Sequence, residues 1–286
     1  MPRAREPDPE EQLEFVEQRI RSARQAGKRD FLRDERARKV EDEVFDRATL
    51  LALWKLIHKG VVATLDYPIS TGKEANVFHA TDPKGKALAV KIFRISNATF
   101  YAFKEYISGD PRFESVAGNR RQLVYLWVRK EYKNLLRLHD VGIPVPTPIT
   151  STANVLCMEF LGEQGTPAPL LKDAEIEDPT GAYEDMIAHV RLAWQEADLV
   201  HGDLSEFNVV VHGGKPFWID VGQAVVTRHP MSREFLLRDV RNVTRFFARH
   251  GAKVRPAEEV VAELVAPKKT TATDGEARPR SRRPSR

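Results

Sequence analysis

The sequence lacks a second cysteine, an apolar run long enough to cross a bilayer, and an apolar stretch at its beginning. The single cysteine, Cys157, excludes an intrachain disulfide, and we expect it to be a small core residue because it lies in the apolar run 155–160. No run of about 18 apolar residues exists, so no membrane span is predicted. The first residues, MPRAREPDPEEQ, lack the apolar region of a secretory signal. We therefore expect a cytoplasmic protein with no membrane partner.

Charge is unevenly distributed along the chain. The formal net charge is +4, but beyond residue 266 seven basic residues oppose two acidic ones, so the remainder is slightly negative. We predict a basic, disordered tail over residues 266–286. This tail either contacts RNA phosphates in a salt-dependent way or is a solvated end with no partner. The eight histidines show no metal-ligand spacing among themselves or with Cys157.

The first 48 residues carry interspersed charges of both signs and few apolar residues. Helix-compatible spacing occurs around residues 13–24, so we expect a marginal helix or disorder there rather than a domain. The character changes at LLALWKLIHKG, residues 50–60, where apolar residues recur at helical spacing and Gly60 suits a C-terminal cap.

Three strand-like runs follow, at residues 61–69, 76–81 and 87–94, with a D-P-K-G turn between the last two. The sequence STGKE lies between the first two runs. A turn that holds one glycine and a lysine could place backbone N–H groups over phosphates. It is not a Walker A loop, because Glu74 follows the lysine where Ser or Thr is required. A plain hairpin turn is the alternative.

The segment 200–223, VHGDLSEFNVVVHGGKPFWIDVGQ, holds the most suggestive spacing in the chain. Asn208 follows Asp203 by five positions, which gives D-x-x-x-x-N, and Asp220 comes after an apolar, strand-like run. In protein kinases this spacing places an Asp that orients or deprotonates the acceptor hydroxyl and an Asn that holds Mg²⁺. Asp220 stands where the D-F-G aspartate grips the metal. The alternative is two exposed turn aspartates beside a hairpin.

Lys91 lies in the middle of the third strand-like run, A-L-A-V-K-I-F. It is either an edge-strand lysine that reaches water or the strand lysine that pairs with ATP phosphates and with a helix glutamate. Residues 122–138 are expected to form a helix with an apolar stripe, and Glu131 lies on that stripe. A carboxylate there needs a partner because unpaired burial is costly, and Lys91 is the natural one. The alternative is a Glu131 at the edge of the stripe that faces solvent.

Further along the chain we expect a strand at 155–160 and helices at 183–197, 229–250 and 256–264. Few residues separate Gln223 from the helix at 229–250, so there is no room for an activation loop. The polar stretch 95–121 is long for a connection and is interpreted as a mobile functional insert, in which Thr99, Ser108 and Ser115 are hydroxyls open to phosphorylation.

These motifs together resemble the RIO family of atypical serine/threonine kinases. The resemblance rests on STGKEANVFHA, AVKIFR, HGDLSEFNVVV, IDVGQAV and EFLLRDVRNVTRFF, it covers about residues 49–265, and it is strongest toward the first subfamily and its archaeal members. It implies an α+β, bilobal kinase-like fold with an antiparallel N-lobe sheet, a helix C and a reduced helical C-lobe without an activation loop. The implied divisions are 1–48 as an extension, 49–265 as the kinase domain and 266–286 as the tail. Within the domain, the N-lobe would span 49–160, the hinge 159–162 and the C-lobe 163–265.

The resemblance also implies roles for particular residues. Lys91 would bind ATP with Glu131 as its partner, Asp203 would be the catalytic proton acceptor, and Asn208 and Asp220 would hold Mg²⁺ or Mn²⁺. The remaining ATP contacts would come from the phosphate loop and the hinge: Ser70, Gly72, Lys73, Glu74, Glu159 and Leu161. Gly222 departs from the family, where Ser is expected in many relatives, and would loosen the turn beside Asp220.

In function, the resemblance implies Mg-ATP-dependent protein kinase or ATPase activity, autophosphorylation, and a transient phosphoaspartate at Asp220. It further implies precursors of the small ribosomal subunit, both protein and RNA, as partners. Two other readings stay open. One is an ATP-gated assembly factor with little kinase activity, and the other is a small-molecule kinase, because H-G-D also occurs in aminoglycoside- and choline-type kinases. The sequence leaves the oligomeric state unknown.

Overall fold

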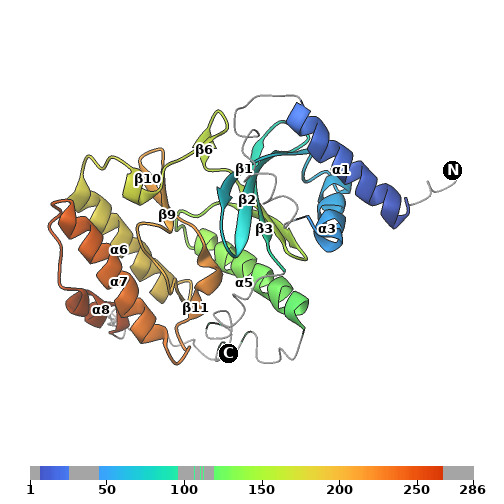
Figure 1. Ribbon diagram of the computed structural model, residues 1–286. Helices are drawn as coiled ribbons and strands as arrows, with labels where there is room; N and C mark the ends of the chain where they lie inside the picture. The colour runs from blue at the N-terminus through green and yellow to red at the C-terminus, as the bar shows by residue number, and fades with distance from the viewer. Residues whose placement is uncertain are drawn as a thin grey trace, which may run out of the picture.

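The computed structural model describes residues 7–25, 45–95, 106, 110, 112 and 119–266, with the side chains of 20–25 excepted. Its elements form two lobes, one built on a sheet and the other on helices (Figure 1). The predicted tail and most of the insert 95–121, including Thr99, Ser108 and Ser115, lie outside the described residues. The α+β, two-lobed fold expected from the sequence is confirmed.

One antiparallel sheet of five strands forms the first lobe, in the order β1-β2-β3-β5-β4. Its strands are β1 (Thr64–Thr71), β2 (Ala75–Thr81), β3 (Ala87–Phe93), β4 (Pro148–Thr152) and β5 (Val155–Glu159). The D-P-K-G turn joins β2 to β3 as predicted, because the Asp82 carboxylate accepts hydrogen bonds from the backbone N–H groups of Lys84 and Lys86. Cys157 is fully buried in β5, as expected.

Two helices cover part of this sheet. Helix α3 (Arg47–His58) begins where Asp46 accepts a hydrogen bond from Thr49 N, and its apolar face packs on the sheet. Helix α1 (Pro9–Gln25) lies against α3 and β1 (Figure 1) and buries Val16 completely. The helical spacing seen around residues 13–24 therefore corresponds to a helix that packs onto the domain, and residues 26–44 lie outside the described part of the chain.

Helix α5 (Arg120–Asp140) lies between the lobes (Figure 1). It begins at Asn119, whose side chain accepts a hydrogen bond from Gln122 N. Its apolar stripe, which includes Val128 and Leu135, joins the large hydrophobic core that continues into the second lobe. Because one helix packs on both lobes, its side chains can reach sites formed by either.

The second lobe contains three packed helices, α6 (Pro179–Gln195), α7 (Ser232–Arg249) and α8 (Ala257–Val265). Short elements connect them: β6 (Gly162–Glu163), β7 (Thr166–Pro167), η2 (Leu171–Asp173), β8 (Leu199–Val200), β9 (Val209–His212), β10 (Lys215–Trp218), η3 (Val221–Gln223) and β11 (Val225–Val226). Between Asp220 and α7 the structure describes every residue, and this stretch holds only η3, β11 and a short turn, so it has no room for an activation loop. No helix in the described ranges is long and apolar enough to cross a membrane.

Candidate active site

The third strand and helix α5 bring a lysine and a glutamate together between the lobes. Lys91 points from β3 toward α5, and its Nζ donates to Glu131 Oε1 at 2.7 Å and Oε2 at 3.0 Å. Both residues are buried, with 8% of Lys91 and 1% of Glu131 exposed. The pairing expected from the apolar stripe is therefore present, and the two alternatives of an edge-strand lysine and a solvent-facing glutamate are excluded.

Asp220 joins this pair from the second lobe. Its Oδ1 accepts a hydrogen bond from Lys91 Nζ at 3.1 Å, while 48% of its side chain remains exposed. Burial lowers the pKa of Lys91, but the carboxylates of Asp220 and Glu131 outweigh this effect and raise it above its ordinary value. The Lys91 ammonium in turn lowers the pKa of Asp220. The site therefore holds a fixed ammonium beside an ionised, accessible carboxylate.

Asp203 and Asn208 form the second part of the site. Asn208 Nδ2 donates to the backbone oxygen of Asp203 at 2.8 Å and to its Oδ2 at 3.1 Å, which fixes the carboxylate. Burial raises the pKa of Asp203, the charge of Asp220 adds to this effect, and the hydrogen bond from Asn208 opposes it. A positioned carboxylate with a raised pKa is suited to accept a proton.

Helix α7 holds the backbone on both sides of Asp203. The buried Asp239 accepts hydrogen bonds from the N–H groups of Gly202 at 2.8 Å and Leu204 at 2.9 Å. Arg238 donates to the Gly202 carbonyl, and Asn242 Nδ2 donates to the Leu204 carbonyl at 3.2 Å. Burial raises the pKa of Asp239 to about 7. Sequence reasoning assigned these residues no role. Their signal was the motif EFLLRDVRNVTRFF, in which an Asp occurs on the apolar side of a helix.

His201 contacts the same loop through its imidazole ring. It is 3% exposed, its Nε2 lies 3.2 Å from the Ile219 carbonyl oxygen, and its Nδ1 accepts a hydrogen bond from Asp203 N at 3.3 Å. Burial lowers the pKa of His201 to about 4, so the imidazole is neutral near pH 7. It links the Asp203 backbone to the residue before Asp220 without adding charge.

The STGKE segment lies where β1 joins β2. Its backbone closes where Gly72 N donates to the Ala75 carbonyl at 2.9 Å, and residues 70–73 are exposed. Glu74 is half-buried, and its pKa is raised by burial and by the nearby charge of Asp220. The Glu74 side chain therefore lies within electrostatic reach of the site, whereas Ser70, which ends β1 with Thr71, and Lys73 of the turn are exposed.

The segment after β5 connects the lobes. The Glu159 N–H donates to the Thr147 carbonyl and the Leu161 carbonyl accepts from Ala168 N–H. These two groups are therefore occupied within the protein, which leaves the Glu159 carbonyl and the Leu161 N–H as the backbone groups that a ligand edge could use under the hinge interpretation.

The turn after Asp220 does not have the looseness expected from Gly222. A Cβ at this position would lie 2.8 Å from Trp127 Nε1, so the indole of α5 fills the space of a side chain. The Gly222 carbonyl also accepts a hydrogen bond from Lys130. The close approach of Trp127 requires a glycine here. The expectation that Gly222 loosens the turn beside Asp220 is therefore wrong.

A divalent cation fits the chemistry of these groups. Because Asn208 directs its Nδ2 at Asp203, its Oδ1 is left as a neutral oxygen donor, and the backbone of Asn208 is bonded to that of Ile219, the residue before Asp220. The described residues contain no group of three His, Cys, Asp or Glu side chains placed to hold a metal by themselves. This suits Mg²⁺, which is bound through one or two protein oxygens together with substrate phosphates and water.

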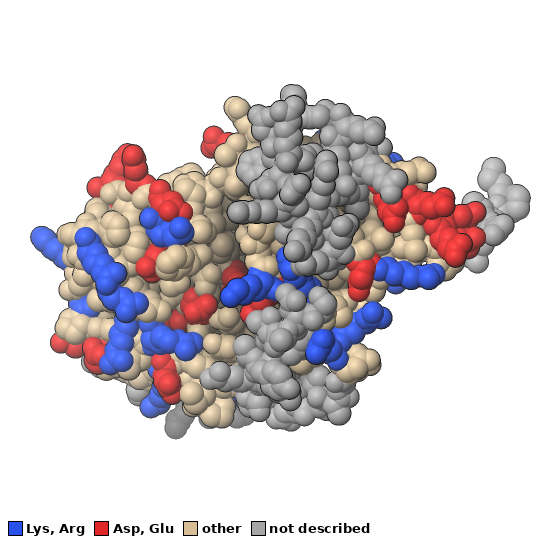
Figure 2. Space-filling model, in the orientation of Figure 1, with Lys and Arg blue, Asp and Glu red and all other residues tan. Residues whose placement is uncertain are grey.

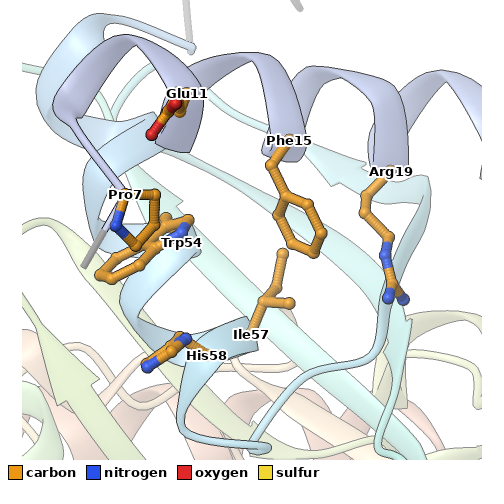
Figure 3. A pocket seen from close by; sticks show the side chains of 7 residues that line it. All are labelled: Pro7, Glu11, Phe15, Arg19, Trp54, Ile57 and His58. Atoms are coloured by element: carbon orange, nitrogen blue, oxygen red, sulfur yellow. The ribbon is translucent and has the colours of Figure 1, made fainter. Parts of the chain in front are cut away.

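Acidic and basic side chains gather between the two lobes on the face shown in Figure 2. A separate surface hollow of about 400 Å³ lies between α1 and α3, and its lining side chains point toward one another in Figure 3. Its lining consists of Pro7, Glu11, Phe15, Arg19, Trp54, Ile57 and His58. None of the predicted site residues lies there, so the charged groups between the lobes remain the candidate active site.

Comparisons with known proteins agree with this geometry. A family model described as the RIO domain matches residues 76–260. The RIO-type serine/threonine-protein kinase Rio1 of Haloferax volcanii is 46% identical over 221 residues, which cover 77% of this chain and 76% of that protein. The human serine/threonine-protein kinase RIO1 is 39% identical over 82% of this chain, which matches 42% of the human protein.

The fold is similar to that of the Rio2 kinase from Chaetomium thermophilum. One crystal structure of that protein aligns with a TM-score of 0.62 and 27% identity, and covers 78% of this chain and 69% of the other. A second, of its ADP/Mg²⁺-phosphoaspartate complex, aligns with a TM-score of 0.59 and 28% identity over 75% of this chain and 66% of the other. Together with the matched family model, these similarities show that the chain belongs to the RIO family, and its sequence is similar to relatives named Rio1.

Proposed function

We propose that the protein is a Mg²⁺-dependent ATP phosphotransferase of the serine/threonine protein kinase type. The observation that carries this proposal is the meeting of Lys91 with both Glu131 and Asp220, beside the hydrogen-bonded pair of Asp203 and Asn208. Phosphoryl transfer requires little covalent chemistry from the protein. It requires fixed charges that position the phosphates and neutralise the charge that develops on them, which this arrangement supplies.

Each side chain has a role in this proposal. Lys91, held by Glu131, binds the α- and β-phosphates. Asn208 and Asp220 would hold Mg²⁺, which when bound would supply charge that neutralises the phosphates. Asp203 orients the acceptor hydroxyl and takes its proton, for which its raised pKa suits it.

The remaining ATP contacts follow from position. Ser70, Gly72, Lys73 and Glu74 would line the phosphates; the Gly72 N–H closes the turn on the Ala75 carbonyl, so Gly72 would contribute the close approach of its backbone and not a free N–H donor. The Glu159 carbonyl and the Leu161 N–H would bind the adenine edge, because the other two hinge groups are already hydrogen-bonded. The domain limits 49–265, with the hinge at 159–162, belong to the same proposal.

Asp220 is also proposed as a phosphoryl acceptor. A carboxylate oxygen of Asp220 attacks the γ-phosphorus, the bond to the bridging oxygen breaks, and ADP leaves with that oxygen. Water then hydrolyses the acyl phosphate and releases inorganic phosphate, so the net reaction is ATP hydrolysis. Support comes from the exposed, ionised carboxylate of Asp220 and from the phosphoaspartate complex of the related Rio2 kinase.

Precursors of the small ribosomal subunit are the proposed setting for this activity, by family resemblance. An assembly factor gated by ATP would use the same hydrolysis, and Asp220 as acceptor favours this second candidate. A small-molecule kinase is disfavoured, since only η3 and β11 lie between Asp220 and α7, where such an enzyme would build its substrate pocket.

The experiment uses ATP labelled at the γ-phosphate and follows both label transfer and phosphate release. Asp203→Ala is expected to abolish autophosphorylation and to retain Mg-ATP binding, whereas Asp220→Asn is expected to abolish Mg²⁺-dependent turnover. Asp140→Ala, at the exposed end of α5, is the matched control and should behave as wild type. A folded Asp203→Ala variant that keeps every phosphoryl-transfer activity would contradict the kinase role of Asp203.

A further inference from the structure

Helix α5 carries a second buried ionisable side chain, Lys130, immediately before Glu131. The side chain of Lys130 has no exposed surface, although lysines are almost never fully buried without a partner. Its Nζ donates hydrogen bonds of 2.6 Å to the carbonyl oxygens of Gly222 and Ala224. Burial lowers the pKa of Lys130 to about 7, and the nitrogen carries enough hydrogens for both bonds whether it is protonated or neutral. The Lys130 side chain thus binds the backbone of the turn that follows Asp220.

Asn134, one turn further along α5, binds the same segment. Its Nδ2 donates to the Val221 carbonyl at 2.8 Å and to the Ala224 carbonyl at 3.2 Å. Its Oδ1 accepts a hydrogen bond from Arg112 Nη1 at 2.8 Å, and the buried Asp110 neutralises Arg112. Every member of this cluster has a partner, so it fixes one arrangement of the turn.

Asp220, which lies directly before this segment, is strained, unlike the other charged site residues Lys91, Glu131 and Asp203. Asp220 has φ 57° and ψ 52°, the left-handed conformation that non-glycine residues rarely adopt. Such a conformation is costly and persists only where the surroundings determine it. The bonds from α5 to the carbonyls of Val221, Gly222 and Ala224, and the indole of Trp127 against Gly222, are the surroundings that do so.

We propose that Lys130 and Asn134 are positioning residues for the metal-binding carboxylate of Asp220. They do not touch ATP or the metal, and act through the carbonyl groups of the turn. Helix α5 then positions both halves of the site, since Glu131 holds Lys91 of the first lobe while Lys130 holds the Asp220 turn of the second. This inference rests on the proposed function, because it assigns Asp220 as a ligand of Mg²⁺.

The test separates metal binding from nucleotide binding. The dissociation constant of a non-hydrolysable ATP analogue is measured by calorimetry with and without Mg²⁺. Residues that orient a metal ligand typically change metal affinity by about 10–100-fold when removed. In the wild type, Mg²⁺ should tighten binding of the ATP analogue. In Lys130→Met we therefore expect this tightening to be at least about tenfold smaller. Affinity without Mg²⁺ should be unchanged, because Lys91 and Glu131 are intact.

Hydrogen exchange provides a readout that does not depend on ligand. In Lys130→Met the backbone amides of residues 219–226 should exchange faster than in the wild type, since the Gly222 carbonyl loses its bond from Lys130 and the Ala224 carbonyl keeps only its longer bonds from other side chains. Asn134→Ala should change both measurements in the same direction. Arg112 acts on the turn mainly through Asn134, so Arg112→Ala should reduce the Mg²⁺-dependent tightening by a smaller factor. This milder variant replaces Lys130→Met if that variant fails to fold.

Asn154→Ala is the matched control for lost stability. Asn154 is also fully buried and its Nδ2 donates two hydrogen bonds, to Thr49 Oγ1 and the Phe93 carbonyl, on the α3 side of the sheet. It should lower the melting temperature and leave the Mg²⁺-dependent tightening intact. The inference is overturned if folded Lys130→Met or Arg112→Ala retains the full tightening. A wild-type protein whose nucleotide affinity ignores Mg²⁺ would instead contradict the proposed function, and this inference with it.

Discussion

Replacing Lys91 by methionine leaves the carboxylate of Glu131 buried without its partner. The Lys91 Nζ lies 2.7 Å from Glu131 Oε1, and only 1% of the Glu131 side chain is exposed. Removing one member of a buried ion pair costs about 3–5 kcal/mol because the remaining charge is uncompensated. Burial already raises the pKa of Glu131, so uptake of a proton relieves part of this cost. We therefore expect Lys91→Met to lower the free energy of unfolding by about 3 kcal/mol at pH 7, a large share of the roughly 5–15 kcal/mol typical of a domain.

The double variant Lys91→Met/Glu131→Met separates stability from function. With both charges replaced by apolar groups of similar length, most of the lost stability should return, because no charge remains buried. Binding of Mg-ATP should be weak in the single and the double variant alike, since both lack the ammonium. Urea unfolding followed by far-UV circular dichroism gives the stabilities, and calorimetry gives the binding. The reasoning is refuted if Lys91→Met is as stable as the wild type, or if the second substitution restores nothing.

Three further predictions concern Asp239, Gly222 and the tail. The pKa of Asp239 is raised by burial to about 7, so its contribution to stability is full below about pH 4 and is lost as the pH rises through 7. Relative to Asp239→Asn, the wild type should therefore lose up to about 4 kcal/mol between pH 4 and pH 7 in urea titrations, and a constant difference would contradict this. Gly222→Ser should cost about 1–3 kcal/mol by overpacking against the indole of Trp127, and less in a Trp127→Leu background; equal costs in the two backgrounds would show that the indole is not the obstacle. Deleting residues 267–286 should weaken binding to ribosomal RNA and flatten its salt dependence in filter-binding assays, whereas unchanged affinity would identify the tail as a solvated end.

Much of the site could be predicted from the sequence because its residues break the pattern of their surroundings. Lys91 in an alternating apolar strand and Glu131 on the apolar face of a helix each required a buried partner of opposite charge, and the structure pairs them at 2.7 Å. Asp203 and Asn208 are close in the chain, so their spacing alone determined that they could meet. Asp203 and Asn208 form a short-range pattern, and the buried charges of Lys91 and Glu131 are stable only when they are paired with each other.

The residues that hold the backbone beside Asp203 and Asp220 could not be predicted in the same way. Lys130 lies next to Glu131 in a charged stretch, and nothing in its neighbours distinguishes it from an exposed lysine. Its partners are the carbonyls of Gly222 and Ala224, which carry no side-chain signal and lie 92 and 94 residues away. The expectation for Gly222 failed for a related reason, because the indole that fills its side-chain position comes from another helix.

The most direct test of the central claim is incubation of the purified protein with Mg²⁺ and γ-labelled ATP, followed by acid quenching. Wild-type protein should become labelled or release labelled phosphate. Asp220→Asn should do neither, although it keeps Lys91 paired with Glu131, and Asp140→Ala should match the wild type. Label transfer or phosphate release by Asp220→Asn at the wild-type rate would show that the charged cluster between the lobes is not the site of phosphoryl transfer.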